Sequence, residues 1–186
     1  MNDKHAKILK TVELAMLAAL SVVLMLLVRF PLIPSAAFLE YDMGDVPVLI
    51  STFLFGPIAG FAVLVVESLI QAITVSAASG WVGFVMHVCS SGVFLISAGL
   101  IYKKFISVKG LLLALTVGSI LMTLVMIPLN LIFTVHFLGS PREVVIDMLI
   151  PAIIPFNLFK AVINSAVAGL IFVPLQKILK NAKLLP

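Results

Sequence analysis

The sequence has few charged residues for its length, and this shortage excludes a water-soluble domain. Asp, Glu, Lys and Arg make up 11% of the 186 residues, whereas hydrophobic residues make up 62%. A soluble globular domain has about 25% charged and about 45–50% apolar residues, so this composition cannot provide a water-facing surface. We therefore expect an all-α integral membrane protein, in which residues 1–186 form one bundle without a separate soluble domain.

Other residues and motifs are also scarce, and each absence removes a class of function. The single cysteine, Cys89, excludes an intrachain disulfide and a cysteine metal cluster. The chain has no G-x-x-x-x-G-K-[ST] phosphate loop, no H-E-x-x-H motif, no G-x-S-x-G motif and no paired carboxylates on one helix. We therefore expect no enzyme activity, no metal site, no cofactor, and no ATP hydrolysis by this chain.

Long apolar runs are what the sequence does contain, and a membrane-spanning helix needs about 20 such residues. Four runs predict one crossing each, at about 8–28, 81–102, 111–137 and 153–179. The block 46–75 is too long for one crossing, and the sequence GPIAG at 56–60 divides it into two, of which the first is short or tilted. Pro128 is expected to kink the fifth of the six helices.

The basic residues predict the orientation of this six-helix bundle. Nine of the twelve fall in three clusters that six crossings place on one side of the membrane: Lys4, Lys7, Lys10, Lys103, Lys104, Lys109, Lys177, Lys180 and Lys183. The positive-inside rule then puts both termini in the cytoplasm and a long first loop outside. Topology explains the basic excess, so we expect no nucleic-acid partner. A cleaved signal peptide is the alternative interpretation of the N-terminal run, and Glu13 within that run speaks against it.

Polar residues interrupt the last apolar run in the stretch IPFNLFKAVINS, residues 154–165. A Lys near the centre of a membrane helix costs about 2.5–3.5 kcal/mol on insertion scales. At 100° per residue, Asn157, Lys160 and Asn164 lie within about 60° of one another in the outer half of the helix. Polar groups at this depth face the bundle interior or a wet cavity, so this stripe predicts the wall of a pocket open to the outside.

Two other helices and the first outer loop bring polar groups to the same side. Asn130 lies near the outer end of the fifth helix, Asp147 lies just before the sixth, and FLEYDMGD (38–45) lies in the loop. Amide and ammonium groups beside aromatic residues suit a small molecule with a planar face and a carbonyl or hydroxyl edge. The alternative is that these residues only hold helices together, with Lys160 paired to Asp147.

Three stretches resemble the riboflavin-specific S components of energy-coupling factor (ECF) transporters: FLEYDMGDVPVLI, GPIAG and PFNLFKAVINS. The resemblance covers essentially the full chain. It implies that the protein captures riboflavin from outside a bacterial cell membrane, with the first outer loop as a cap over the pocket. By matching motif it implies riboflavin-binding roles for Leu39, Tyr41, Asn130, Asp147, Asn157, Lys160 and Asn164.

The same resemblance implies partners. S components work with a transmembrane coupling protein and a pair of ATP-binding cassette ATPases, which would supply the energy. Ala15 and Ala19 on the first helix have the Ala-x-x-x-Ala spacing of the family's docking surface, and small residues permit close helix approach.

Three alternatives stay open: an S component for another vitamin, a stand-alone secondary carrier with Glu67 as its coupling residue, and a small enzyme acting on lipid. Glu67 and Gln71 are interpreted as structural partners, and His87 as an interior histidine.

Overall fold

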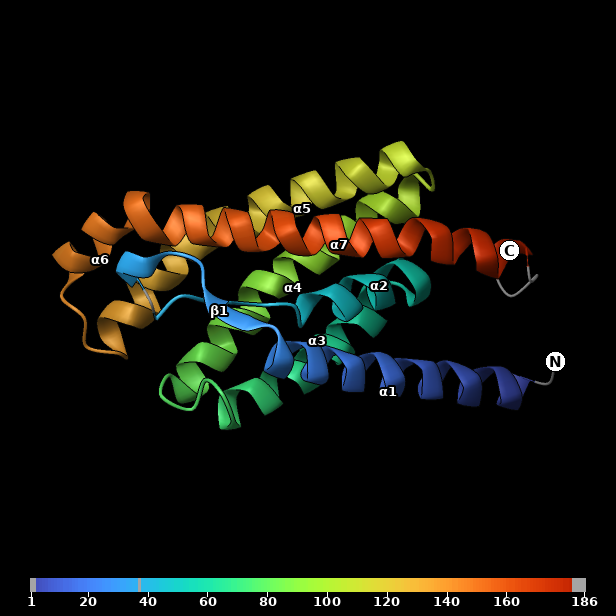
Figure 1. The fold of residues 1–186 in the computed structure, drawn as a ribbon, viewed down its shortest axis with the longest axis horizontal. Coiled ribbons are helices and arrows are strands. Elements are labelled where there is room, and N and C mark those ends of the chain that lie inside the picture. The colour runs from blue at the N-terminus through green and yellow to red at the C-terminus, as the bar shows by residue number, and fades with distance from the viewer. Residues whose placement is uncertain (1–2, 37, 182–186) are drawn as a thin grey trace.

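The computed structural model describes residues 3–36 and 38–181, so Lys183 of the C-terminal basic cluster lies outside the described residues. Within these ranges the chain forms a helical bundle with one small β-hairpin (Figure 1). The α-helices are α1 (Asp3–Leu27), α2 (Asp45–Phe55), α3 (Pro57–Ile73), α4 (Gly80–Lys104), α5 (Val108–Leu129), α6 (Arg142–Met148) and α7 (Ile154–Asn181). The remaining elements are β1 (Arg29–Pro31), β2 (Glu40–Asp42), the 3₁₀ turn η1 (Pro34–Ala36) and the π-helical turns η2 (Asn130–Thr134) and η3 (Leu149–Ile153).

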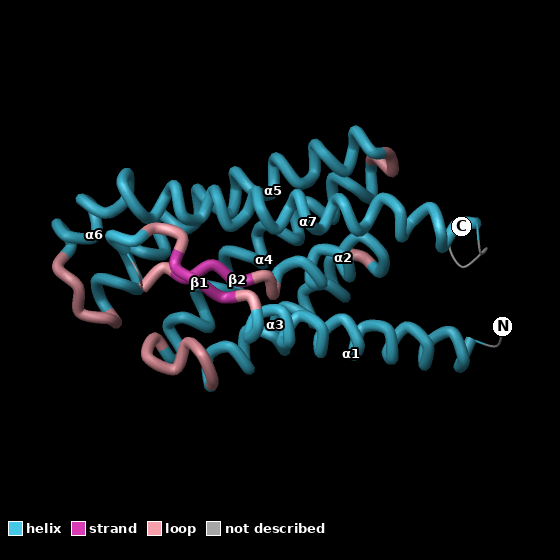
Figure 2. Tube along the Cα trace, viewed as in Figure 1, coloured by secondary structure: helices cyan, strands magenta, loops and turns pink. Residues whose placement is uncertain are grey.

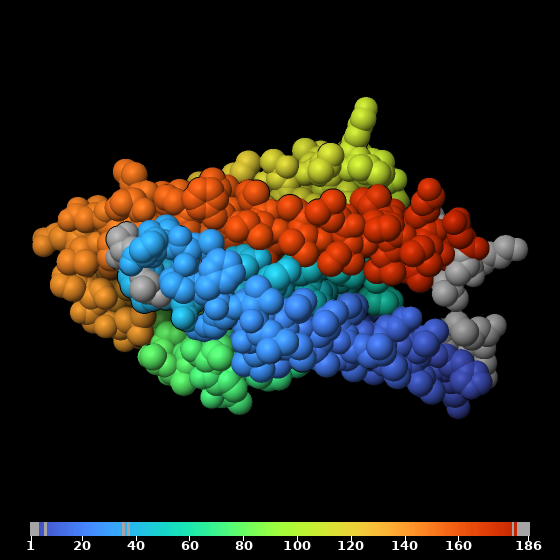
Figure 3. Space-filling model, in the orientation of Figure 1, coloured from blue at the N-terminus to red at the C-terminus, as the bar shows by residue number. Residues whose placement is uncertain are grey.

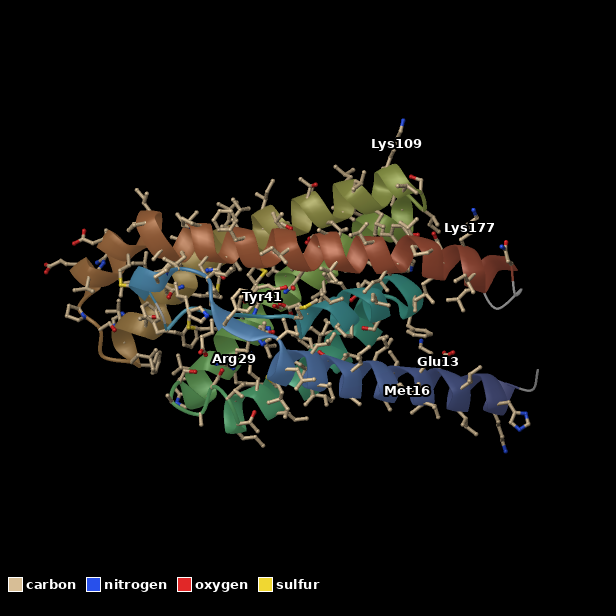
Figure 4. The ribbon with its side chains drawn as sticks, viewed as in Figure 1. Glu13, Met16, Arg29, Tyr41, Lys109 and Lys177 are labelled. Carbon is tan, nitrogen blue, oxygen red and sulfur yellow. The ribbon has the colours of Figure 1, made fainter. Side chains whose placement is uncertain are left out.

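Among the described residues, four helical segments are long and apolar enough to cross a membrane: Lys7–Leu27, Gly80–Lys104, Val108–Thr134 and Arg142–Leu179. The first turn of α1 and the last turn of α7 lie at the same end of the bundle, as six crossings require (Figure 1). Lys109 and Lys177, from two of the basic clusters, lie toward this end (Figure 4). Of the four segments, the one in α1 has the smallest buried share, and Figure 3 shows α1 lying along one side of the molecule.

The predicted break inside the block 46–75 is confirmed. Gly56 ends α2 with φ +94°, a conformation that L-residues rarely adopt, and Pro57 begins α3, where its missing N–H leaves no helical bond unmade. With 11 residues, α2 is about 16 Å long at 1.5 Å per residue, so it covers only part of the bilayer. It lies in the half of the bundle nearer the termini (Figure 1).

The hairpin β1–β2 lies next to α2, on the side away from the termini (Figure 2). There it takes the place that the outer half of a full-length second membrane helix would occupy. Its strands pair antiparallel, with Arg29 opposite Asp42 and Phe30 opposite Tyr41. The first outer loop was predicted as a cap, and the strand pairing within it was not predicted. Non-helical backbone at membrane depth is tolerated where it is buried in protein, and Tyr41 and Asp42 are each only 2% exposed.

The segment before the sixth crossing corrects the sequence prediction. Residues 138–147 were expected to form an outer loop, yet the chain becomes helical at Arg142 and continues through η3 into α7. Pro141 precedes the first turn and Glu143 lies within it, where a negative charge favours a helix start. Near the end of the fifth crossing, Pro128 is followed by the π-helical turn η2, so the irregular turn lies beside the predicted kink.

Candidate functional site

A cavity of about 190 Å³ lies between the hairpin, α3, α4, α5 and α7. Its wall contains both polar and apolar side chains. The polar lining residues are Arg29, Glu40, Asp42, Gln71, Ser76, His87, Ser90, Asn157 and Lys160. The apolar ones are Phe38, Leu39, Met86, Met122, Met126 and Phe156. A larger hollow of about 390 Å³ between α5 and α7 is lined mainly by aliphatic side chains. The smaller cavity has the charged and amide groups that can orient a ligand, so it is the candidate binding site.

Lys160 is held at this depth by Asp42 of the hairpin. Its Nζ donates to Asp42 Oδ2 at 2.7 Å, and Asp45 Oδ2 lies 3.9 Å away. All three side chains are buried. Asp42 is itself fixed, because Oδ1 accepts from the backbone N–H of Gly44 at 3.0 Å and Oδ2 accepts from Gln71 at 3.3 Å. The packing alternative named Asp147 as the partner of Lys160, and the structure shows Asp42 instead.

Asn164 fastens the hairpin to α7 one turn below Lys160. Its Nδ2 donates to the backbone carbonyl of Asp42 at 3.2 Å, and its Oδ1 accepts from the Tyr41 hydroxyl at 2.8 Å. A tyrosine phenol ordinarily ionises only near pH 10, so Tyr41 stays protonated at neutral pH and is the donor of this bond. Figure 4 shows Tyr41, on strand β2 of the hairpin, in the middle of the molecule.

A second layer of ionisable groups lies behind Lys160. His87 Nε2 is 3.3 Å from Asp45 Oδ1, and His87 Nδ1 is 3.1 Å from Ser68 Oγ and 3.6 Å from Glu67 Oε2. Glu67 is completely buried. The sequence had suggested Gln71 as the partner of Glu67, whereas Gln71 donates to Asp42. The site thus contains three buried carboxylates around one lysine and one histidine.

The outer rim of the cavity carries a further ion pair. Arg29 donates through Nε to Glu40 Oε2 at 2.7 Å, which joins the two strands of the hairpin. The guanidinium also reaches Ser76 Oγ, in the turn between α3 and α4, at 3.4–3.5 Å. Within the described ranges, this long contact is the only side-chain hydrogen bond between the hairpin and that turn.

The predicted site residues divide into three groups. Leu39, Asn157 and Lys160 line the cavity, and Asn157 also donates to the carbonyl of Ile153 at 2.7 Å. Tyr41 and Asn164 are buried behind the wall and hold the hairpin in place.

The remaining two lie away from the cavity wall. Asn130 is buried in η2, where it donates to the carbonyl of Met126 at 2.8 Å and accepts from Thr134 at 3.1 Å. Asp147 is exposed on α6. Ala15 and Ala19, the predicted docking residues, are exposed on α1, and their neighbour Met16 projects from the same helix to the outside (Figure 4).

Several residues of the site were not among the predicted ligand-binding residues, including Arg29, Asp42, Asp45 and His87. Asp42 and Asp45 belong to the stretch EYDMGD, which had been assigned to the outer loop. Acidic residues in an outer loop are ordinarily solvated, so their type gave no reason to place them inside. Their position could have indicated burial, because they directly precede the apolar helix 46–55, and this helix is too short to reach the outer surface.

Comparison with known proteins agrees with this architecture. The family described as "ECF transporter, substrate-specific component" matches residues 9–172. The chain is 33% identical over 178 residues to the riboflavin transporter FmnP of Bacillus subtilis, covering 91% of this chain and 93% of the relative. It is 34% identical over 179 residues to the riboflavin transporter RibU of Streptococcus thermophilus, covering 91% and 85%.

A solved structure shares the fold. The S component of a bacterial ECF transporter superposes with a TM-score of 0.81 at 32% sequence identity, covering 94% of this chain and 99% of the solved one. S components of ECF transporters are transport subunits that work with an energising module, and they are not enzymes. The chain therefore belongs to the substrate-specific components of ECF transporters, multi-pass proteins of the bacterial membrane.

Proposed function

We propose that this protein binds riboflavin from outside the cell and passes it inward with a transmembrane coupling protein and two ATPases. The observation that carries the proposal is the buried ammonium of Lys160 at the cavity wall beside Asn157, facing apolar and aromatic side chains. The two relatives above that are named riboflavin transporters support the choice of ligand. Family membership sets aside the stand-alone carrier and the lipid enzyme, and an S component for another vitamin is the remaining alternative.

The polar and the apolar lining residues of the cavity suit different parts of riboflavin. Lys160 has three N–H donors and gives one to Asp42, so two remain for the carbonyl or hydroxyl oxygens of a ligand. Asn157 supplies amide chemistry beside it, while Leu39 and Phe156 offer apolar surface to a planar ring. Tyr41 and Asn164 act indirectly, by fixing the hairpin that carries Leu39. Asn130 and Asp147 do not line the cavity, so we expect neither side chain to contact the ligand directly.

The cavity must enlarge to admit this ligand. Its volume of about 190 Å³ is below the about 300–1,000 Å³ of pockets that hold drug-sized molecules. The thioether chains of Met86, Met122 and Met126 can rearrange, because methionine adapts readily to new packing. We expect the hairpin to shift on the side where Arg29 holds it to Ser76 through contacts of 3.4–3.5 Å. We therefore expect riboflavin to bind with a shift of the hairpin.

The binding experiment uses ligand-free protein in detergent. Riboflavin should bind saturably with loss of its own fluorescence, and other vitamins should not compete. Lys160→Met should weaken binding about 10- to 150-fold, the equivalent of a charge-assisted hydrogen bond of about 1.5–3 kcal/mol. Lys177→Met, at an exposed lysine of the same helix, is the matched control and should bind normally. Tight binding of another vitamin, with riboflavin ignored, would show that the ligand is a different one.

Docking to the coupling protein is proposed through Ala15 and Ala19, which are exposed on the little-covered helix α1. Ala15→Leu or Ala19→Leu should leave riboflavin affinity unchanged and lower uptake in vesicles that contain the complete transporter. Met16→Leu, which keeps a bulky side chain on the same helix, is the control. Normal uptake by both leucine variants would place the docking surface elsewhere.

A further inference from the structure

Four side chains form a continuous hydrogen-bonded chain behind the ligand cavity. Glu67 Oε2 accepts from Ser68 Oγ at 3.4 Å, Ser68 Oγ lies 3.1 Å from His87 Nδ1, and His87 Nε2 lies 3.3 Å from Asp45 Oδ1. Asp45 Oδ2 is 3.9 Å from Lys160 Nζ, which lines the cavity. The chain therefore runs from a fully buried carboxyl on α3 to the cation at the ligand site.

The hydrogen atoms of this chain can be arranged in two ways. Asp45 is an acceptor when ionised, so His87 Nε2 carries a hydrogen and donates to it. Ser68 has one hydroxyl hydrogen, which goes either to Glu67 or to His87 Nδ1. In the first arrangement the imidazole is positively charged and Glu67 is ionised, and in the second the imidazole is neutral and Glu67 is protonated. The two arrangements differ by one proton held at His87 or at Glu67, and both fit the same heavy-atom positions.

The charges around Glu67 leave room for one further proton. The elements around it contribute Asp42 from β2, Asp45 from α2, His87 from α4 and Lys160 from α7, while α1 contributes the apolar Met25. With every group charged, three carboxylates oppose two cations, and one negative charge remains uncompensated in a buried site. Burying an unpaired charge is costly, so binding of a proton is favoured.

The same cluster has buried oxygens that no hydrogen bond uses. Within the part of the chain that the structure describes, Glu67 Oε1 and Asp45 Oδ2 have no hydrogen-bond partner. Glu67 Oε1 also sits against the backbone, because a Cβ added at Gly44 would lie 2.7 Å from it. An ionised carboxylate oxygen in such a place is unsatisfied, whereas a protonated carboxyl carries no net charge to stabilise.

We propose that this cluster is a proton-binding site and that the proton held at Glu67 increases the affinity of the cavity for its ligand. The proton comes from water and forms an O–H bond on the carboxyl, so no other reactant is needed. Its binding removes one negative charge that competes for the Lys160 ammonium, which is then freer to donate to a ligand oxygen. The inference rests on the proposed riboflavin-binding function, because affinity for riboflavin is its readout.

The test is the dissociation constant of riboflavin measured between about pH 5.5 and 8.5, the range in which buried His–carboxyl clusters titrate. By linkage, the wild-type constant should rise with pH, approaching about tenfold per pH unit where one proton is lost. Tyr41 does not interfere, because a tyrosine phenol ordinarily ionises near pH 10, above this range. Glu67→Gln, which mimics the protonated carboxyl, should bind tightly at every pH in this range.

Matched controls separate the possible failures. Glu143→Gln, at an exposed carboxylate of α6, should keep the wild-type pH profile. A pH-independent wild type, or a Glu67→Gln variant that keeps the wild-type slope, overturns the proton site and leaves riboflavin binding intact. Absence of riboflavin binding at all pH values overturns the proposed function and, with it, this inference.

A second measurement does not depend on any variant folding. Calorimetric titration of the wild-type protein in buffers of different ionisation enthalpy reports the protons taken up on binding. Up to one proton should be taken up per riboflavin in the alkaline part of the range. Identical heats in all buffers at every pH would overturn the proton site.

Discussion

Replacement of Lys160 by methionine tests how the bundle tolerates a buried cation. Methionine keeps an unbranched apolar stem and removes the ammonium. The carboxylate oxygens of Asp42 and Asp45 then lose a cation at 2.7 Å and 3.9 Å, while both side chains stay buried. The variant therefore contains buried negative charge that the wild-type protein compensates.

The size of the effect follows from breaking one side of a buried pair. Removal of a single partner costs about 3–5 kcal/mol, because the other charge is left uncompensated. Adding Asp42→Asn removes part of that charge, and the amide oxygen can still accept from the N–H of Gly44. We expect the double variant to recover about 2 kcal/mol or more of the stability that Lys160→Met loses.

Thermal unfolding followed by tryptophan emission measures this difference. Trp81, in the first turn of α4, is the single tryptophan of the chain, and it packs against Phe133 in η2 and against Phe137 beyond it. A loss of about 3–5 kcal/mol lowers the melting temperature by about 6–20 °C for a protein of this size. Both variants should bind riboflavin poorly, since each lacks the ammonium. A single variant as stable as the wild type, or a double variant less stable than the single one, would refute the reasoning.

Three smaller changes test other parts of the site. Tyr41→Phe leaves the buried Asn164 Oδ1 without its hydrogen-bond donor, which should lower the free energy of unfolding by about 1–3 kcal/mol. Thermal unfolding measures this loss, and an unchanged melting temperature would contradict the Tyr41–Asn164 contact. Gly44→Ala places a methyl group against Glu67 Oε1, so overpacking should destabilise the fold by about 1–3 kcal/mol, and normal stability would show that the backbone there has room. Asp147→Asn changes an exposed side chain and should alter the dissociation constant by less than about twofold, whereas a tenfold loss would bring α6 into the site.

The helices were predictable because their signals are local. An apolar run of sufficient length indicates a crossing whatever surrounds it, and Gly56 followed by Pro57 breaks a helix by backbone geometry alone. The helical start at Arg142 was missed because its charged residues look like a loop. The hairpin was missed because it has short strands and no turn signature, and its buried position depends on contacts with α7.

For the site, helical spacing predicted which residues of the last helix face inward, but the sequence did not predict which acidic residue pairs with Lys160. Helical periodicity placed Asn157, Lys160 and Asn164 on one inward face, and their burial confirms that orientation. The partner of Lys160 could not be chosen from the sequence, because several acidic residues precede crossings on the outer side. Asp42 becomes the partner only because the hairpin descends into the bundle and brings its carboxylate to 2.7 Å.

The hairpin is held by contacts of unequal length on its two sides. Toward α7, the hairpin is tied by three hydrogen bonds of 2.7–3.2 Å that involve Lys160 and Asn164. Toward the turn between α3 and α4, it is tied at its rim by the 3.4–3.5 Å contacts of Arg29 with Ser76. We therefore expect a ligand to enter on the Ser76 side, where the hairpin is held by the longer contacts.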